Sequence, residues 1–331
     1  MTTNNGLRLG TTIYSFTNEY HSRRYTLDQL IAKVAELDLG PGVELVGFSH
    51  VRGFPTVTDE FADHLKMLLD QNGLQPSCLG LNADVQIRRD HRMTEDECYD
   101  YHVAQVQAAA KLGFPVVRHQ LPAGPEVTRR LVPLAERLNV KLGLEIHAPE
   151  RVDTPSILAF REMYAKVDSP FLGFIPDFGA CARAIPPSFT ESFRKQGIRD
   201  ELIALALECW ELSGTLQERI GEYRKREKAA GATDFEIGRM TVIFSVLARM
   251  DPRAWLEIMP QVVHIHGKCY DFDENGDEVA IPYGDILPLF RDSGYSGFMS
   301  TEWEGHASSD EDGIPKVQAH HVLCKRILGM A

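Results

Sequence analysis

The sequence lacks the paired cysteines that bind zinc or build a disulfide framework. No Cys-x-x-Cys spacing occurs, and the six cysteines are widely scattered: Cys78, Cys98, Cys181, Cys209, Cys269 and Cys324. No segment reaches the roughly 20 apolar residues of a membrane span. The amino-terminal stretch MTTNNGLRLG has no apolar run of signal-peptide length. We therefore expect a reduced, cytoplasmic protein with no membrane association.

Positive charge is also scarce. Lys and Arg number 35 against 47 Asp and Glu, so the net charge is −12. A duplex nucleic-acid partner needs clustered Lys and Arg, and this composition argues against one. The first strand-to-helix connection reads YSFTN rather than Gly-x-Gly-x-x-Gly. That connection argues against a dinucleotide-binding fold.

Eight short apolar runs alternate with amphipathic stretches along the chain. Runs of this length and composition are typical of parallel strands that are buried on both faces. Alternation predicts βαβ units, and a count of eight predicts an α/β protein with a closed (β/α)8 TIM barrel. We expect one domain over residues 1–331. The predicted strands are Leu9–Phe16, Val43–Phe48, Pro76–Asn82, Pro115–Leu121, Lys141–Ala148, Phe171–Phe178, Val262–Lys268 and Gly297–Trp303.

Helical periodicity fills the intervals between these strands. Thr56 and Asp59 have the spacing of an amino-terminal capping pair, and Gly113 is a plausible carboxy-terminal cap. The predicted helices are Tyr25–Leu37, Thr58–Gln71, Thr94–Leu112, Glu126–Leu138, Pro155–Val167, Tyr283–Ser293 and Val317–Leu328.

The interval between the sixth and seventh strands is too long for one crossover helix. Residues 180–260 predict a helical insertion, with helices over Asp200–Leu212 and Phe235–Met250. Its charged run, residues 222–228, predicts a solvated helix face. An insertion of this kind on a barrel usually shapes the active-site mouth or a subunit contact.

Four consecutive strands carry charged or imidazole groups at their carboxyl ends, where barrel enzymes place their active sites. Residues two apart in a strand share a face. The groups concerned are Glu145 and His147 on the fifth strand, Asp177 on the sixth, His264, His266 and Lys268 on the seventh, and Glu302 and Glu304 on the eighth.

Burying such charges is costly unless they are paired or bound to a metal. Taken singly, each has a structural explanation: a Glu as a salt-bridge partner, Asp177 as a turn cap, a His as a hydrogen-bonded core residue. Their conjunction on four successive strands favours one shared cation. Three carboxylates and an imidazole suit Mn²⁺ or Mg²⁺ better than a metal that prefers thiolates. Tyr14 and His119 are open between a core role and a substrate contact.

The strand ends resemble those of the xylose-isomerase-like barrel superfamily of sugar isomerases and epimerases. The matching motifs are Leu-Glu-Ile at 144–146, Pro-Asp-Phe at 176–178, His-Ile-His-Gly-Lys at 264–268 and Thr-Glu-Trp at 301–303. The resemblance covers essentially the whole barrel. It implies one divalent metal, with Mn²⁺ favoured over Mg²⁺ or Co²⁺, and the ligands Glu145, Asp177, His266 and Glu302.

A narrower resemblance follows from one departure. Many epimerases of this type carry a His three residues after the sixth-strand Asp, where this chain has Ala180. His147 in Glu-Ile-His-Ala-Pro, the long insertion and the Cys-Tyr-Asp-Phe-Asp run at 269–273 are more similar to the large (alpha) subunit of bacterial C-glycoside deglycosidases. That resemblance implies a small β-rich partner subunit in a hetero-oligomer. It also implies a glycoside substrate that is already oxidised to a ketone at sugar carbon 3.

The expected reaction is removal of the C2 proton next to that ketone, followed by β-elimination of the aglycone. A neutral imidazole has a suitable pKa for the general base, so we expect His147 to take the proton. Lys268 or His264 is expected to protonate the leaving group. Tyr14, His119, His264 and Glu304 are expected to bind substrate.

Three alternatives remain open. In a ketose epimerase or sugar isomerase, Glu145 and Glu302 would both bind the metal and move a proton. An inert barrel would only bind a partner or an inositol-like ligand, and it would purify without stoichiometric metal. A phosphate-ester endonuclease of the same barrel type is less favoured, because such sites hold several metals with more His ligands and this chain is strongly acidic.

Overall fold

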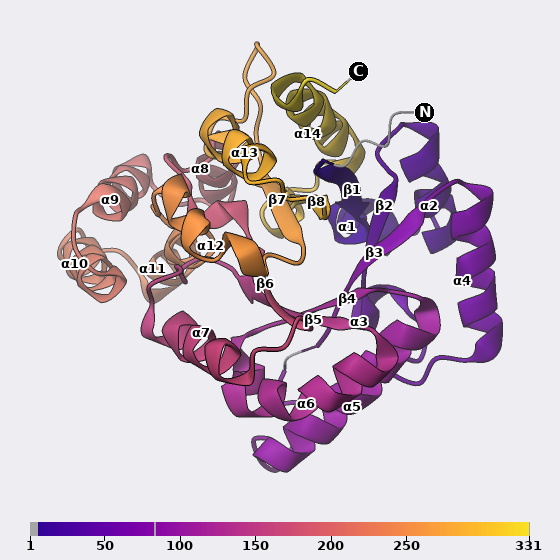
Figure 1. Ribbon diagram of the computed structural model, residues 1–331. Helices are drawn as coiled ribbons and strands as arrows, with labels where there is room; N and C mark the ends of the chain where they lie inside the picture. Colours follow the sequence, from indigo (N-terminus) through magenta and orange to yellow (C-terminus); the bar gives the residue numbers. More distant parts are fainter. Residues whose placement is uncertain (1–5, 83, 331) are drawn as a thin grey trace.

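Eight parallel strands form a nearly closed barrel, seen end-on at the centre of the computed structural model (Figure 1). The structure describes residues 6–82 and 84–330. The strand order is β6-β5-β4-β3-β2-β1-β8-β7, so β1 pairs with both β2 and β8. The strands are β1 (Arg8–Thr12), β2 (Gly42–Val46), β3 (Gln75–Gly80), β4 (Val116–His119), β5 (Lys141–Ile146), β6 (Leu172–Pro176), β7 (Ile265–Cys269) and β8 (Phe298–Trp303).

Two isolated parallel bridges join the remaining edges, β6 and β7. They pair Phe174 with Val262 and Asp177 with His266. The second bridge aligns a predicted ligand at the end of β6 with one inside β7. The predicted α/β-barrel class is confirmed, while the assignment of the whole chain to one domain stays a prediction.

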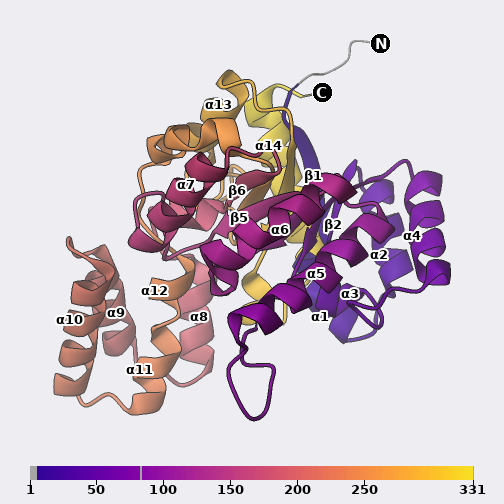
Figure 2. The ribbon, with the colours of Figure 1, turned by 60° about the horizontal axis from the view of Figure 1, so that its bottom comes forward.

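Helices surround the strands (Figures 1 and 2). Their buried apolar residues belong to one core cluster with those of the strands, as expected of amphipathic helices. The long outer helices are α2 (Leu27–Glu36), α4 (Asp59–Gln71), α5 (Glu95–Leu112), α6 (Gly124–Leu138), α7 (Pro155–Val167), α13 (Tyr283–Asp292) and α14 (Gly313–Leu328). Two short helices, α1 (Thr17–His21) and α3 (Gly47–His50), follow β1 and β2 closely.

Local capping confirms one predicted boundary and corrects another. Gly113 ends α5 in the left-handed region at φ 85°, as expected of a glycine cap. Helix α4 is capped by Thr58, whose side chain accepts a hydrogen bond from the amide of Phe61, so the predicted Thr56 cap is wrong. Several strands also end earlier than predicted. Strand β7 begins at Ile265, so His264 lies just before the strand and not within it.

Five α-helices lie between β6 and β7: α8 (Pro187–Lys195), α9 (Asp200–Glu211), α10 (Leu216–Ala229), α11 (Asp234–Met240) and α12 (Ile243–Val246). Figures 1 and 2 show α9, α10 and α11 at the periphery, away from the strands. The predicted continuous helix over Phe235–Met250 is wrong, because it breaks between α11 and α12. The charged run on α10 is not wholly solvated either, since Tyr223 and Glu227 are completely buried.

No helix in residues 6–82 and 84–330 combines the length and the apolar character that crossing a bilayer requires.

Candidate functional site

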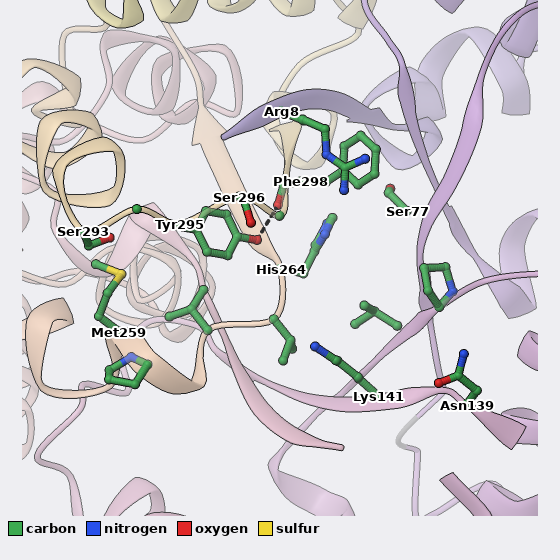
Figure 3. Close-up of a pocket in the computed structure, with 17 residues that line it drawn as sticks. Arg8, Ser77, Asn139, Lys141, Met259, His264, Ser293, Tyr295, Ser296 and Phe298 are labelled. Carbon is green, nitrogen blue, oxygen red and sulfur yellow. Dashed lines mark hydrogen bonds between the residues drawn. The ribbon is translucent and has the colours of Figure 1, made fainter. Parts of the chain in front are cut away.

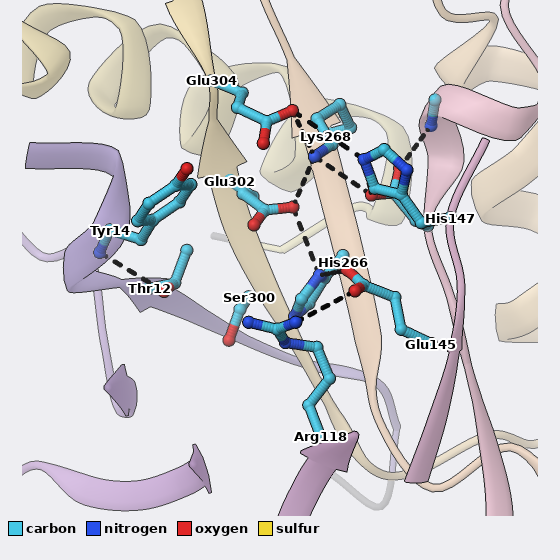
Figure 4. A network of polar contacts seen from close by, with 12 residues as sticks. Thr12, Tyr14, Arg118, Glu145, His147, His266, Lys268, Ser300, Glu302 and Glu304 are labelled. Carbon is cyan, nitrogen blue, oxygen red and sulfur yellow. Dashed lines mark hydrogen bonds and ion pairs between the residues drawn. The ribbon is translucent and has the colours of Figure 1, made fainter. Parts of the chain in front are cut away.

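Strands β5 to β8 bring the four predicted ligands together at the carboxyl end of the barrel (Figure 4). Glu145 lies in β5, His266 in β7 and Glu302 in β8. Asp177 follows β6 directly and caps the turn after it, where Oδ1 accepts a hydrogen bond from the amide of Gly179 at 2.7 Å. That bond fixes one carboxylate oxygen and leaves Oδ2 for the interior.

One donor atom from each of Glu145, Asp177, His266 and Glu302 lies within 4.8 Å of the others, and all four residues are buried. Nδ1 of His266 lies 2.8 Å from Oε1 of Glu145 and 3.2 Å from Oε2 of Glu302. Among the described residues, Asp177 Oδ2, His266 Nδ1 and Glu302 Oε2 make no hydrogen bond of good geometry, and their short contacts are ion pairs with Lys268 or within the ligand set. Buried polar atoms are usually hydrogen-bonded, and three atoms that converge on one point without such bonds fit a divalent cation.

Lys268 supplies a fixed positive charge next to this set. Its Nζ lies 3.0 Å from Asp177 Oδ2 and 2.8 Å from carboxylate oxygens of both Glu302 and Glu304. Burial disfavours the ammonium, but these carboxylates outweigh that cost and hold the pKa of Lys268 well above its usual value. Lys268 is therefore charged at neutral pH.

His147 leaves β5 two residues after Glu145 and faces the same carboxylates (Figure 4). Its Nδ1 lies 2.5 Å from the carbonyl oxygen of Ala148, an acceptor that places the proton on Nδ1. Its Nε2 lies 3.9 Å from Asp177 Oδ2 and 4.0 Å from Glu304 Oε2. Burial opposes the charged ring, yet Asp177 and Glu304 prevail and raise the pKa of His147 to about 9.

Arg118 is a member of the site that the sequence argument missed. Its Nη1 donates to Oε2 of Glu145 at 3.0 Å, and Gln120 donates to the same oxygen at 3.1 Å. Gly80 on β3 makes room for it, because a Cβ there would lie 2.7 Å from Arg118 Nη2. The buried guanidinium of Arg118 thus sets the orientation of Glu145. The alternation of side chains along β4 was the sequence signal that could have predicted the inward position of Arg118.

Glu44 on β2 was missed as well. Its Oε1 lies 3.0 Å from Nε2 of His266, and its Oε2 lies 2.9 Å from Nε2 of His264. All three side chains are at most 1% exposed. A single Glu within an apolar strand gives little sequence signal, because its partners are more than 200 positions away.

A pocket of about 490 Å³ at this end of the barrel is lined by Glu145 and Glu302, two of the predicted ligands. Its lining is mixed in character: Glu145, His147, Glu302 and Glu304 are polar, while Val46, Phe48 and Leu81, from the ends of β2 and β3, are apolar. Burial raises the pKa of Tyr14, which also lines the pocket, to about 12, so its phenol is a hydrogen-bond donor at neutral pH. The pocket is lined by Tyr14, Val46, Phe48, Leu81, Asn82, Asp84, Arg118, Gln120, Glu145, His147, Glu302 and Glu304.

Two predicted substrate contacts lie elsewhere: among the described residues that line the pocket, neither His119 nor His264 occurs. The ring of His119 packs near Phe160 of α7, with centroids 6.0 Å apart, because it has the outward parity on β4. His264 has the inward parity but lies deeper in the barrel. It lines a separate cavity of about 740 Å³ at the amino-terminal ends of the strands (Figure 3).

The ring of parallel strands and the helices around it define a TIM barrel. A sugar phosphate isomerase/epimerase from Parabacteroides distasonis superimposes with a TM-score of 0.57 at 14% identity, covering 99% of this chain and 97% of that one. A xylose isomerase-like TIM barrel protein from Mycobacterium smegmatis in complex with magnesium gives 0.55 at 14% identity, with both chains fully covered. At these identities the likeness establishes the fold.

Sequence relatives identify the family. The chain is 39% identical over 332 residues to the 3'-dehydrocarminate deglycosidase alpha subunit of Microbacterium sp., covering 97% of this chain and 95% of the relative. It is 40% identical over 329 residues to a C-glycoside deglycosidase alpha subunit of Arthrobacter globiformis, covering 98% and 93%. No family model matches the chain. The chain belongs to the family of C-glycoside deglycosidase alpha subunits, which are enzymes, and the resemblance inferred from its strand ends is confirmed.

Proposed function

We propose that this chain cleaves the C-glycosidic bond of a 3-oxo-C-glycoside and releases the aglycone by β-elimination. Family membership supports this class of substrate. The observation that carries the mechanism is the position of His147, which lines the pocket with its Nε2 3.9 Å from the ligand carboxylate of Asp177.

The metal in this proposal is held by Glu145, Asp177, His266 and Glu302, whose buried, converging donor atoms support the assignment. Bound there, a divalent ion supplies Lewis-acid polarisation of a carbonyl and a neighbouring hydroxyl oxygen. Mn²⁺ is the proposed ion, with Mg²⁺ and Co²⁺ as alternatives, because their ligand preferences overlap. Two barrels of similar fold are described with a zinc atom and with magnesium.

His147 takes the proton from sugar carbon 2 in the proposed reaction. The electron pair of that C–H bond forms the C1–C2 double bond while the bond from C1 to the aglycone carbon breaks. The departing carbon takes up one proton, for which we propose the buried ammonium of Lys268, 2.8 Å from the pocket residue Glu304. The products are a 1,2-unsaturated 3-keto sugar and the protonated aglycone, so one proton is removed and one is returned.

The charge of the pocket affects the protonation state of His147, the proposed base. An imidazolium cannot accept a proton, and the carboxylates of Asp177 and Glu304 favour that form of His147. A divalent cation among the ligands offsets the same negative charge and favours the neutral ring. Tyr14 and Glu304 are proposed to hold sugar hydroxyls, because both polar groups line the pocket.

A small β subunit is the proposed partner, since the relatives carry the designation alpha subunit. The helices between β6 and β7 are its proposed contact, because they lie at the periphery of the barrel (Figure 2). A cytoplasmic location stays a prediction.

Elemental analysis paired with an activity screen tests the proposal. The protein, alone and with any subunit that co-purifies with it, is incubated with 3-oxo-C-glucosides and Mn²⁺. About one metal per chain, with aglycone release that disappears in Glu145→Ala, is the expected result. Metal without aglycone release in the complete complex would contradict the cleavage reaction, and absence of metal would contradict the site.

Ketose epimerisation or sugar isomerisation is the second candidate. It is favoured by the symmetric approach of Glu145 and Glu302 to His266 Nδ1, at 2.8 and 3.2 Å, which gives two carboxylates able to move a proton. Incubation with free ketoses in deuterated water separates the two reactions. Deuterium uptake with sugar interconversion supports the epimerase, whereas inert ketoses together with aglycone release support the deglycosidase.

A further inference from the structure

Glu44 is buried below the ligand set, and both of its carboxylate oxygens are engaged by histidines. Oε1 lies 3.0 Å from Nε2 of His266, and Oε2 lies 2.9 Å from Nε2 of His264. The residue lies in the middle of β2, on the opposite side of the barrel from β6, and is 1% exposed. His264 and His266, the two histidines that it contacts, are more than 200 positions away in the sequence.

The two nitrogens of His266 face different surroundings. Nε2 faces Glu44, an acceptor, while Nδ1 faces Glu145 and Glu302 and has no hydrogen-bond partner among the described residues. An imidazole whose one nitrogen donates to a carboxylate carries its proton there and presents a lone pair on the other nitrogen. The same contact also fixes the plane of the ring.

We propose that Glu44 is a positioning residue for the metal site, which holds His266 in the Nε2–H tautomer and aims Nδ1 at the ion. This inference rests on the proposed metal site, and it adds a residue outside the four ligands. Glu44 acts only through His266 and touches neither substrate nor metal. Carboxylate partners of metal-binding histidines commonly contribute 10- to 100-fold to metal affinity.

A competing interpretation is that Glu44 is itself a ligand, because Glu44, Cys78 and His264 also have donor atoms within 4.8 Å of one another. The contacts favour the positioning role. Both oxygens of Glu44 are already occupied, and Nε2 of His264 is also 3.0 Å from Ser300 Oγ. Burial raises the pKa of the Cys78 thiol well above its usual value, so this sulfur stays protonated and is a poor ligand.

Mn²⁺ titration of the metal-free protein, read by the EPR signal of free Mn²⁺, tests the proposal without substrate. Glu44→Gln and Glu44→Ala are compared with wild type and with Ser300→Ala, a buried barrel substitution that removes a contact of His264 only. We expect one ion per chain throughout, affinity reduced about 10- to 100-fold in the Glu44 variants, and affinity within threefold of wild type in Ser300→Ala. Circular dichroism melting of the metal-free proteins confirms that each variant is folded.

Loading the protein with Co²⁺ allows a second measurement, by proton NMR, that a general loss of packing would not change. The Nε2 proton of a Co²⁺-bound His266 gives a hyperfine-shifted, exchangeable proton resonance. We expect it to exchange slowly in wild type and Ser300→Ala, and rapidly in Glu44→Gln, where the charged acceptor is gone.

Three results overturn the inference: Mn²⁺ affinity in folded Glu44→Gln within threefold of wild type, a wild type that binds no divalent ion, and two ions per chain that fall to one in Glu44→Gln. The last result makes Glu44 a direct ligand. A different result would contradict only the proposed reaction: the wild type binds one ion tightly, its Mn²⁺ affinity depends on Glu44, and it releases no aglycone. The positioning role of Glu44 would then stand.

Discussion

Nζ of Lys268 lies 3.0 Å from Oδ2 of Asp177, and neither side chain is exposed to solvent. The same ammonium is 2.8 Å from Glu302 and from Glu304. Three carboxylates surround this one buried ammonium, so the charge balance of the site depends on Lys268. In the proposed holoenzyme it depends on the bound metal ion as well. Removing either cation leaves buried negative charge without compensation.

Lys268→Met is therefore expected to lower the free energy of unfolding of the chelated protein by about 3–5 kcal/mol, the usual cost of removing one partner from a buried ion pair. Added Mn²⁺ is expected to recover part of the loss, because a ligand that binds only the folded state stabilises it. Urea unfolding with EDTA and with Mn²⁺ measures both effects.

Lys166→Met is the matched control. Lys166 pairs with Glu162 at 2.7 Å, but both side chains are about 70% exposed. Exposed pairs contribute less than about 1 kcal/mol, so little change is expected. If Lys268→Met in EDTA unfolds at the same urea concentration as Lys166→Met, the charge-balance argument is wrong.

His147→Gln is expected to abolish proton removal while leaving metal binding intact. The imidazole is not one of the four converging ligands, and a general base contributes about 10²- to 10⁴-fold to rate. Aglycone release and exchange of the C2 proton should both fall by that factor, with unchanged Mn²⁺ content. His64→Gln, at an exposed His that pairs with Asp28, is the control. Full activity in a metal-loaded His147→Gln protein would exclude the role.

Much of the ligand set could be predicted because parallel strands in a barrel end on one face. Glu145 and Glu302 lie one residue before the ends of their strands, Asp177 directly follows β6, and His266 lies within β7, so strand order alone brings these predicted ligands close together. Spacing of two residues within a strand also predicted that Lys268 shares the face of His266, and its Nζ lies 2.8 Å from the predicted ligand Glu302.

Two geometric factors explain the site residues that were placed wrongly: which face of a strand a side chain occupies, and how deep it lies along the barrel axis. His119 was expected in the site, but Arg118 has the inward parity on β4, and one residue of offset turns the imidazole outward. His264 has the right parity but lies one layer below His266, where it meets Glu44. The sequence does not report depth along the barrel axis, because that depends on strand tilt and on where each strand begins.

Phe48→Ala is expected to weaken binding of substrates with a large apolar aglycone. Phe48 is 57% exposed yet lines the pocket, as do the apolar Val46 and Leu81. Loss of about 1–1.5 kcal/mol of aromatic contact corresponds to a KM increase of about tenfold, with little change in kcat.

Phe235→Ala controls for the removal of an exposed ring. Phe235 is 60% exposed, lies on α11 and is absent from the described lining of the pocket. Steady-state kinetics with aryl 3-oxo-C-glucosides should show the KM effect in Phe48→Ala alone. Equal KM values for both variants and wild type would remove Phe48 from the aglycone side of the pocket.

Glu227→Gln is expected to stabilise the protein at alkaline pH. Glu227 is completely buried on α10, and neither carboxylate oxygen has a hydrogen-bond partner among the described residues. Burial, reinforced by Glu236, raises its pKa to about 7. Between the unfolded value of 4.5 and 7 the folded state binds a proton that the unfolded state releases, so stability falls as pH rises through this window.

Urea midpoints at pH 5 and pH 8 measure this dependence. The gain of Glu227→Gln over wild type should be larger at pH 8, where the buried carboxylate of the wild type has ionised without a partner. Glu222→Gln, five residues earlier on α10, is the control, because Glu222 accepts a hydrogen bond from Arg226 at 2.7 Å and its pKa is lowered by that contact. That variant should be no more stable than wild type at either pH. A Glu227→Gln protein whose advantage is the same at both pH values would show that the carboxyl does not titrate in this window.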